Sequence, residues 1–254
     1  MKISVCGKGG SGKSTVVSLL AGHAEASGYK VIVVDSDESN TGLFRMLGFP
    51  NPPIPLMELA GGKKAIKGKM GQPNILAESQ ITTADIPSQF FLKRNGLRMV
   101  SIGKILQSME GCACPMGVLN REFLKKLKLD KNELVIVDME AGVEHFGRGI
   151  DDSIDTVLLV VEPSMESIAV AEKIRDMTAG MKKNLQSVLN KVSSQDISSE
   201  LKAMLKDKSI EIAGVIPYDP AVFEACFKGR AMAHGIAFQA AAQILNGLLA
   251  RTIG

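Results

Sequence analysis

The chain has 254 residues, 22% of them charged, and a formal net charge of +3 at pH 7. This length fits a single α/β domain over residues 1–254. The charge is too weak to indicate a polyanionic partner, and 4% aromatic residues without tryptophan offer no stacking platform for single strands. No apolar run is long enough to span a bilayer, and the first expected strand begins at residue 2. We therefore expect a cytoplasmic protein with reduced thiols that binds neither nucleic acid nor membranes.

The first motif is a phosphate-binding loop. Residues 7–14 read GKGGSGKS and match G-x-x-x-x-G-K-[ST], between an expected strand at 2–6 and an expected helix at 15–26. In such a loop backbone N–H groups surround the phosphates, the final lysine reaches the β- and γ-oxygens, and the hydroxyl after it can bind Mg²⁺. The candidate nucleotide-binding residues are Gly9, Gly10, Ser11, Gly12, Lys13, Ser14 and Thr15, with Lys13 also catalytic and Ser14 also a magnesium ligand. A glycine-rich turn without a ligand is the much less favoured alternative.

A second lysine, Lys8, lies inside this loop, although a plain phosphate loop needs only Lys13. The form K-G-G-x-G-K-S/T resembles the deviant Walker A motif of the MinD/ParA/nitrogenase-iron-protein ATPases. The resemblance implies that Lys8 is a catalytic residue that crosses a nucleotide-sandwich homodimer to the phosphates of the partner. A solvated loop lysine is the alternative.

Two aspartates, Asp35 and Asp37, stand at the end of an expected strand near the phosphate loop. Phosphoryl transfer needs mainly positioning and charge neutralisation, so a carboxylate one water away from Mg²⁺ suffices. We expect Asp37 to take this catalytic role, as the second aspartate of the resembled switch I segment does. The alternative for both residues is that they cap the helix that follows.

Residues 48–87 differ in composition from the rest of the chain. Four prolines between 50 and 55 are followed by a segment rich in glycine and lysine and then by polar residues. We interpret this stretch as a mobile insertion, and not as a domain or a repeat.

Cys112 and Cys114 are separated by one residue, which is unusual for a protein with reduced thiols. Such a pair rarely closes a disulfide without strain, whereas two thiolates on one turn can bind a soft or borderline divalent metal. Two subunits face to face would supply four sulfurs, tetrahedral for Zn²⁺ or square-planar for Ni²⁺. Two incidental loop cysteines are the alternative. Cys6 and Cys226 lack such partners, and we expect both in the core.

An apolar strand at 134–137 ends in Asp138, which is the arrangement of a Walker B motif. We expect Asp138 to contact magnesium through water. The continuation resembles switch II, but Glu140 replaces the proline usual in the family, and this leaves the rigidity of the loop open. Glu144 and His145 follow, either at the start of a surface helix or in a relay or metal-adjacent role.

Base recognition is expected from two segments that follow later strands. Asn190 and Lys191 resemble the base-contacting segment of the family, and Pro217 and Tyr218 resemble its second wall. An amide side chain can pair with the amino group and a ring nitrogen of adenine. The segment lacks the aspartate usual in guanine readers, so we expect ATP and ADP as the nucleotides.

Apolar β-branched runs alternate with helical patterns along the chain. The expected strands are 2–6, 31–34, 97–102, 134–137, 157–161, 187–189 and 212–216. This alternation predicts an α/β fold with a mostly parallel central sheet covered by helices on both faces, as in P-loop NTPases. Ligands of such sheets bind beyond the carboxyl ends of the strands, and the motifs above all fall there.

Together these motifs resemble the CooC-type accessory ATPases of carbon monoxide dehydrogenase. The resemblance covers nearly the whole chain, and the cysteine pair is its most discriminating part. It implies an ATPase that binds nickel between two subunits and assists its insertion into carbon monoxide dehydrogenase or the related acetyl-CoA synthase.

Two other functions remain open. A MinD/ParA-like switch that positions a partner would need no metal, and an iron–sulfur electron carrier would be coloured. A MinD-type membrane helix would be basic and amphipathic, whereas residues 240–253 are apolar with Arg251 as the one basic residue. We therefore expect this segment to be a packing helix.

Overall fold

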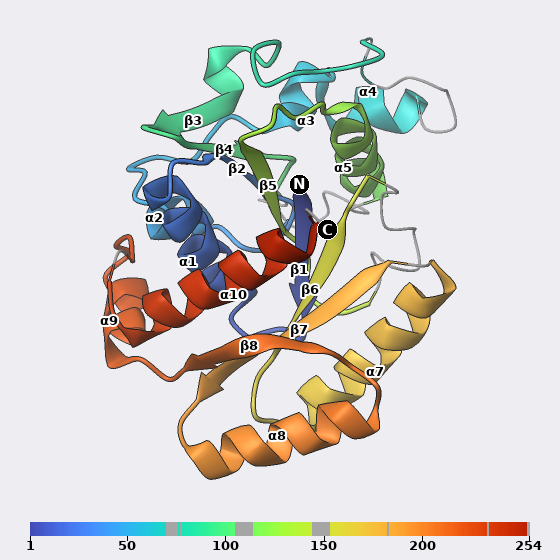
Figure 1. Cartoon of the computed structure of the whole chain (residues 1–254). Helices are drawn as coiled ribbons and strands as arrows, with labels where there is room; N and C mark the ends of the chain where they lie inside the picture. Colours follow the sequence, from blue (N-terminus) through green and yellow to red (C-terminus); the bar gives the residue numbers. More distant parts are fainter. Residues whose placement is uncertain are drawn as a thin grey trace.

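The centre of the molecule is one β-sheet whose strands are almost all parallel (Figure 1). The structure is a computed structural model that describes residues 1–69, 76, 78–104, 114–143, 153–181, 183–232 and 234–252. Within these residues the strand order is β3-β4-β2-β5-β1-β6-β7-β8, and β3 alone runs antiparallel to its neighbour. The strands are β1 (Lys2–Gly7), β2 (Lys30–Asp35), β3 (Phe91–Arg94), β4 (Leu97–Ser101), β5 (Glu133–Asp138), β6 (Thr156–Val161), β7 (Asn184–Val192) and β8 (Ile212–Pro217).

The strands form where the sequence predicts them. Every residue of β1, β5 and β6 is buried, as expected for parallel strands covered on both faces. Each predicted strand overlaps an observed one, and the predicted α/β fold with a mostly parallel sheet is confirmed. The prediction missed β3, a four-residue edge strand without an apolar run. Its signal is the Asn95–Gly96 dipeptide, which is favoured in two-residue hairpin turns and here gives Asn95 a φ of 48°.

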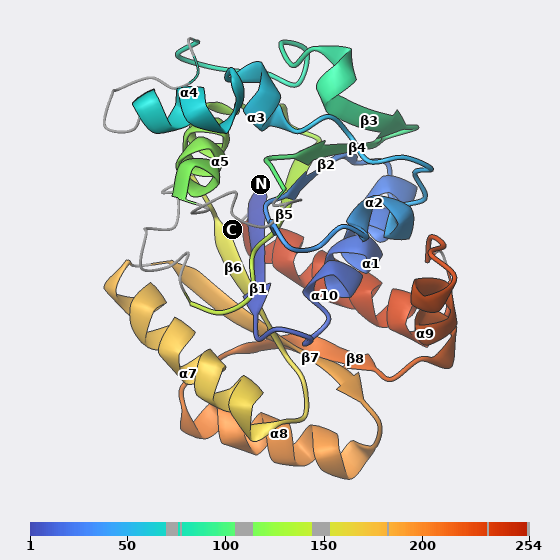
Figure 2. The same cartoon turned by 180° about the vertical axis from the view of Figure 1, so that it is seen from behind.

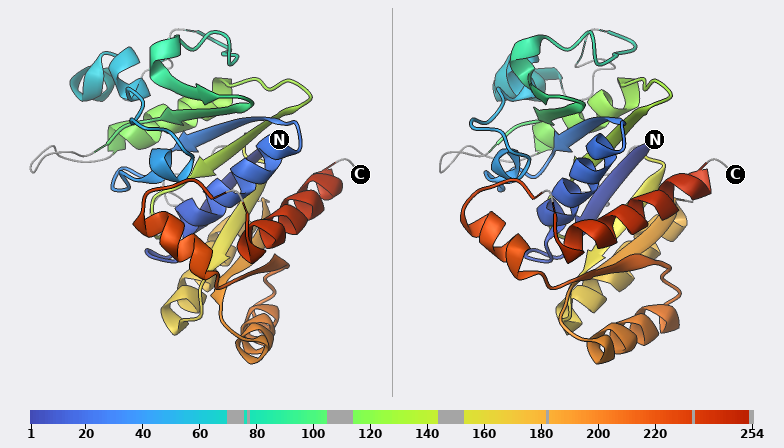
Figure 3. Two further views of the ribbon diagram at one scale, coloured as in Figure 1. Left: turned by 90° about the vertical axis from the view of Figure 1, so that its left-hand side faces the viewer. Right: turned by 60° about the vertical axis from the view of Figure 1, so that its left-hand side comes forward.

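Helices cover both faces of the sheet, each over its own apolar core (Figures 1 and 2). Leu20 and Leu245 belong to the core under α1, α2 and α10, and α1 and α10 pack beside each other (Figure 3). Phe123 and Ile174 belong to the other core, under α3, α4, α5, α7 and α8. The helices are α1 (Lys13–Ala26), α2 (Leu43–Met46), α3 (Leu56–Leu59), α4 (Gly62–Lys69), α5 (Cys114–Lys126), α7 (Met165–Gly180), α8 (Gln195–Asp207), α9 (Pro220–Phe227) and α10 (Ile236–Thr252), with a 3-10 turn, η1, at Ser88–Phe90.

The last helix packs against the body of the protein, as the sequence predicts. Ala241, Ile244, Leu245 and Leu248 of α10 are buried in the core that it shares with α1. In the part of the chain that the structure describes, no helix combines the length and the apolar character needed to cross a bilayer.

The segment at 48–87, interpreted above as a mobile insertion, contains α3, α4 and buried side chains. Leu56 and Ile66 are 1% and 0% exposed and belong to the same core as Phe123 of α5. Ile81 forms an isolated bridge with Leu127 just after α5. The described part of the segment is therefore tied to the domain by apolar contacts, and its mobility stays a prediction.

Replacing Ile66 by alanine measures how firmly α4 is held. An isoleucine with no exposed surface normally loses 2–5 kcal/mol on this change, so we expect Ile66→Ala to lower the unfolding free energy by about 2 kcal/mol or more. Urea unfolding is the measurement. Ile54→Ala is the matched control, because Ile54 is 47% exposed and should lose less than about 0.5 kcal/mol. Equal, small effects of both changes would show that α4 is detached in solution.

Candidate functional site

The phosphate-binding loop follows β1 and leads into α1 at the carboxyl edge of the sheet. Gly7 has a φ of 143°, and a Cβ there would lie 2.4 Å from the Val160 carbonyl oxygen of β6. Gly12 precedes α1 with a φ of 93°, and its Cβ would lie 2.3 Å from Asn190 Nδ2. Glycine is therefore required at both ends of the loop. The first turn of α1 carries no acidic residue, so the N–H groups at its start remain suited to an anion.

Ser14 joins the loop to the end of β5. Its Oγ donates a hydrogen bond to Asp138 Oδ2 at 2.6 Å and accepts one from Asn40 Nδ2 at 2.6 Å. Asp138 is fully buried, and its Oδ1 has no hydrogen-bond partner within the described residues. Burial raises the pKa of Asp138 to about 7, while the hydrogen bond from Ser14 opposes the rise. A buried carboxylate oxygen and an adjacent hydroxyl form a donor set that suits a hydrated Mg²⁺ ion.

Asp35 and Asp37 follow β2 but have different surroundings. Asp35 Oδ2 lies 2.7 Å from Lys104 Nζ, and both side chains are largely buried. Burial raises the pKa of Asp35 to about 6, and the Lys104 ammonium limits this rise. Asp37 Oδ1 accepts hydrogen bonds from Ser39 N, Ser39 Oγ and Asn40 N at 3.0, 2.7 and 3.2 Å. The aspartates thus organise the loop at 35–40, and neither caps a helix.

Lys8 is paired within its own chain. Its Nζ lies 2.9 Å from Glu162 Oε1, directly after β6, and Lys191 Nζ lies 2.8 Å from the other oxygen of Glu162. Lys191 also donates to the Gly10 carbonyl oxygen at 2.5 Å. Lys191 has a positive φ of 59°, beside a register shift between β7 and β8 that turns its side chain toward the loop. The carboxylate of Glu162 therefore connects both lysines.

The predicted base-binding residues line one cavity of about 170 Å³. Asn190, Pro217 and Tyr218 contribute to it, together with Phe223 of α9. Asn190 Nδ2 also donates to the Ser11 carbonyl oxygen at 2.8 Å, so the same side chain supports the phosphate loop. The full lining is Thr15, Leu19, Asn190, Lys191, Ile216, Pro217, Tyr218, Asp219, Val222, Phe223, Cys226 and Ala237. The structure thus gathers both predicted segments beside Thr15.

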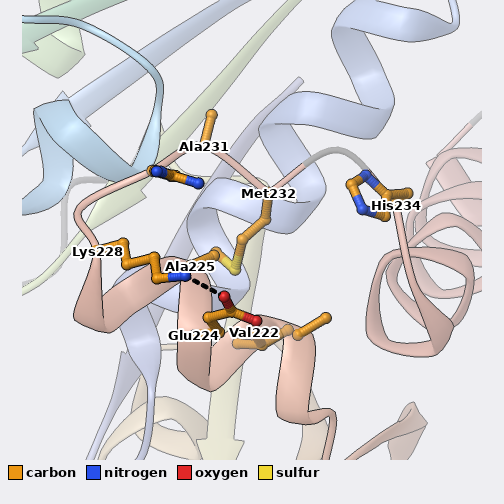
Figure 4. Close-up of a pocket in the computed structure, with 9 residues that line it drawn as sticks. Val222, Glu224, Ala225, Lys228, Ala231, Met232 and His234 are labelled. Carbon is orange, nitrogen blue, oxygen red and sulfur yellow. Dashed lines mark hydrogen bonds and ion pairs between the residues drawn. The ribbon is translucent and has the colours of Figure 1, made fainter.

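A second cavity of about 210 Å³ lies on another side of α9 (Figure 4). Val222 lines both cavities, and the ion pair of Glu224 and Lys228 borders this one. Its lining contains none of the predicted phosphate-binding residues. The cavity that includes Thr15 is therefore the better place for a base.

The predicted thiol site falls largely outside the described residues. This applies to Cys112, and also to Glu144 and His145, whereas Cys114 is the first residue of α5. Within the described residues there is no group of three or more His, Cys, Asp or Glu that could hold a metal ion.

The two other cysteines differ from each other. Cys6 is buried as predicted, and burial raises the pKa of its thiol to about 12. The prediction that Cys226 lies in the core is wrong, because it is exposed on α9, a helix without buried residues.

Three residues at the site escaped the sequence analysis, namely Asn40, Lys104 and Glu162. Lys104 and Glu162 lie just after the ends of β4 and β6, where parallel strands direct side chains toward a ligand. Asn40 lies three residues after Asp37 and bonds Ser14. Position after a strand was thus a usable signal for two of them.

Comparison with known proteins agrees with this geometry. Residues 3–232 match the family described as CobQ/CobB/MinD/ParA nucleotide binding domain. An uncharacterized ATP-binding protein of Methanocaldococcus jannaschii is 41% identical over 84% of this chain and 87% of its own length. The carbon monoxide dehydrogenase accessory protein CooC of Rhodospirillum rubrum is 31% identical over 87% of this chain and 85% of its own. The septum site-determining protein MinD of Pyrococcus horikoshii OT3, complexed with Mg-ADP, shares the fold at a TM-score of 0.73 and 19% identity, covering 100% of this chain and 98% of that chain.

The buried Asp138 should make the stability of the nucleotide-free protein fall as pH rises from about 4 to about 7. Its pKa is about 7 in the fold against an ordinary value of 3.8, so the folded state binds more protons than the unfolded chain in this range. One pKa unit corresponds to about 1.4 kcal/mol, so we expect Asp138→Asn to reduce the fall by at least about 1 kcal/mol. Urea unfolding at pH 5 and pH 8 tests this. Equal changes in both proteins would contradict it.

Proposed function

The chain belongs to the CobQ/CobB/MinD/ParA nucleotide-binding family, as a CooC-type member of its MinD/ParA class, and we propose that it couples ATP hydrolysis to nickel insertion. The client is carbon monoxide dehydrogenase or the related acetyl-CoA synthase. The nickel is cargo, held by Cys112 and Cys114 of two subunits, and Zn²⁺ would suit the same sulfurs in tetrahedral form.

The observation that carries the ATPase part is the bond between Ser14 and Asp138. It joins the end of the phosphate loop to a fully buried carboxylate that has one oxygen free of hydrogen bonds among the described residues. Mg²⁺, when bound with ATP, would neutralise phosphate charge beside these two residues. Ser14 would then give its hydroxyl to the ion, and Asp138 would hold a water of its shell. Lys13, 6% exposed at the start of α1, would contact the phosphates.

Asp37 is the residue that we propose to orient the attacking water. It is buried just after the carboxyl end of β2, and its Oδ1 is fixed by three hydrogen bonds from residues 39 and 40. A carboxylate fixed in this way loses little freedom when it positions a water, which is the main contribution a protein makes to phosphoryl transfer.

The nickel part is supported by the cysteine pair and by the named relative. Cys114 opens α5, and α5 leads through residues 127–132 to β5 and so to Asp138. The chain that carries one proposed nickel ligand therefore continues into the proposed magnesium site. The similarity to CooC supplies the client, because that relative is an accessory protein of carbon monoxide dehydrogenase.

Anaerobic nickel titration of the reduced protein tests the proposal. We expect one tightly bound Ni²⁺ per dimer in equilibrium dialysis, with the dimer mass from light scattering, in at least one of the ADP and ATP states. Cys112→Ala/Cys114→Ala should lose this site. Cys226→Ala is the matched control and should keep it, because Cys226 is exposed on α9, far along the chain from the pair.

Binding that survives in the double variant would refute the cysteine site. Without cysteine-dependent binding in any nucleotide state, a metal-free switch of the MinD/ParA kind becomes the better function. A measurable ATPase in the same samples would show that only the nickel part had failed.

The intrachain pair of Lys8 and Glu162 gives a test of the proposed dimer. Lys8 must leave Glu162 before it can reach the phosphates of a partner, so Glu162→Gln should favour the ATP-bound dimer. Exposed ion pairs are weak, and we expect the protein concentration for half-dimerisation to fall about 2- to 5-fold in light scattering. Glu200→Gln, an exposed change of the same charge in α8, should have no comparable effect. The effect should disappear in a Lys8→Ala background, and its persistence there would contradict the cause.

A further inference from the structure

We propose that Lys104 is a positioning residue for ATP hydrolysis, which acts by fixing the loop that carries Asp37 and Asn40. The inference rests on the proposed ATPase activity. Lys104 follows β4 by three residues and touches none of the residues of the phosphate-binding loop in the hydrogen bonds described above. Its effect on the reaction would therefore pass through the loop.

The ammonium of Lys104 meets three acceptors from the segment of chain between residues 35 and 40. It lies 2.7 Å from Asp35 Oδ2, donates to the Asp37 carbonyl oxygen at 2.5 Å and donates to the Asn40 carbonyl oxygen. A lysine ammonium has three N–H donors, so these contacts use its full capacity. The two carbonyls belong to the first and last residues of the turn closed by the Asp37 side chain. Lys104 thus holds both ends of this turn.

The turn connects Lys104 to the proposed magnesium site. Asn40 Nδ2 donates to Ser14 Oγ, and Ser14 donates to Asp138. The Lys104 side chain is 13% exposed and that of Asp35 is 3% exposed, so solvent screens these charge-assisted bonds only weakly. Loss of the ammonium would free the Asp37 and Asn40 carbonyls together. The carboxylate of Asp37 would then lose its fixed position relative to Ser14.

Because the loop carries Asp37 and no part of the base cavity, the effect should fall on hydrolysis and not on nucleotide affinity. The base cavity is built from α1, β7, β8, α9 and α10, far along the sheet from β4. Loss of these bonds would displace the Asp37 carboxylate from its position for the reaction, so kcat should fall about 10- to 100-fold in Lys104→Met. The Kd for ATP should change less than about 3-fold.

The experiment measures kcat, KM and ATP binding of the full chain with Mg²⁺. Lys104→Arg keeps the charge and should recover part of the rate, because a cavity of about 390 Å³ lined by Lys104, Asp35 and Ser101 gives the larger group room. Lys93→Met is the matched control on β3, where the lysine is exposed, and should leave kcat unchanged.

A double variant distinguishes the positioning role of Lys104 from the instability that an unpaired buried Asp35 would cause. Lys104→Met leaves Asp35 buried without its partner, which destabilises the fold by itself, whereas Lys104→Met/Asp35→Asn removes both charges. We expect the double variant to fold, with a kcat at least about 5-fold below that of Asp35→Asn, in which Lys104 still holds the two carbonyls. Equal kcat values for these two proteins would overturn the inference, and so would a loss in Lys104→Met that appears only as weaker ATP binding. Absence of hydrolysis by the wild-type protein would overturn the proposed ATPase as well.

Discussion

The path of the chain between Gly7 and Gly12 is the constraint on which the site depends. A side chain at either position would meet the Val160 carbonyl or the Asn190 amide at less than the distance that real Cβ atoms allow. The loop can approach β6 and β7 this closely because both residues are glycine. The same approach brings Lys8 to Glu162 after β6 and Asn190 of β7 to the Ser11 carbonyl. One backbone arrangement therefore places the phosphate loop, the partner of Lys8 and the proposed base cavity together.

Polar groups that we propose to contact the nucleotide or its Mg²⁺ are already paired inside the chain. Lys8 and Lys191 share Glu162, Ser14 is bonded to Asp138, and each bond would be exchanged when a nucleotide arrives. Such exchange limits the net gain in free energy, because a lost internal bond offsets part of each new one. The two contacts also differ in how readily they can be replaced. The ion pair of Lys8 and Glu162 is partly exposed, so breaking it costs little free energy. The hydrogen bond at the fully buried Asp138 is replaced only by a group that satisfies the same carboxylate.

The sequence predicts the parallel sheet and the phosphate loop well, because both are encoded locally. Continuous apolar runs identify strands such as β5 and β6, and glycine spacing identifies the loop. Contacts between segments that lie far apart in the sequence could not be predicted from local patterns. Nothing near Lys104 in the chain indicates that its ammonium bonds residues 37 and 40, because that contact arises only when β4 lies beside β2.

Burial of single residues on loosely packed elements was also hard to predict. Cys226 was expected in the core because cysteine is usually buried, yet α9 contributes no buried residue. The hairpin at Asn95 was present as a turn signal but joined a strand too short and polar to be recognised.

The place of β1 in the middle of the sheet has a consequence for how the protein opens. β1 is hydrogen-bonded to β5 on one side and β6 on the other, and every one of its residues is buried. Its amide hydrogens should exchange with solvent only through global unfolding, whereas those of the edge strand β3 exchange by local fraying. β1, which leads into the phosphate loop, therefore belongs to the part of the protein that is best protected from hydrogen exchange. The loops at the carboxyl edge can rearrange while that part stays folded.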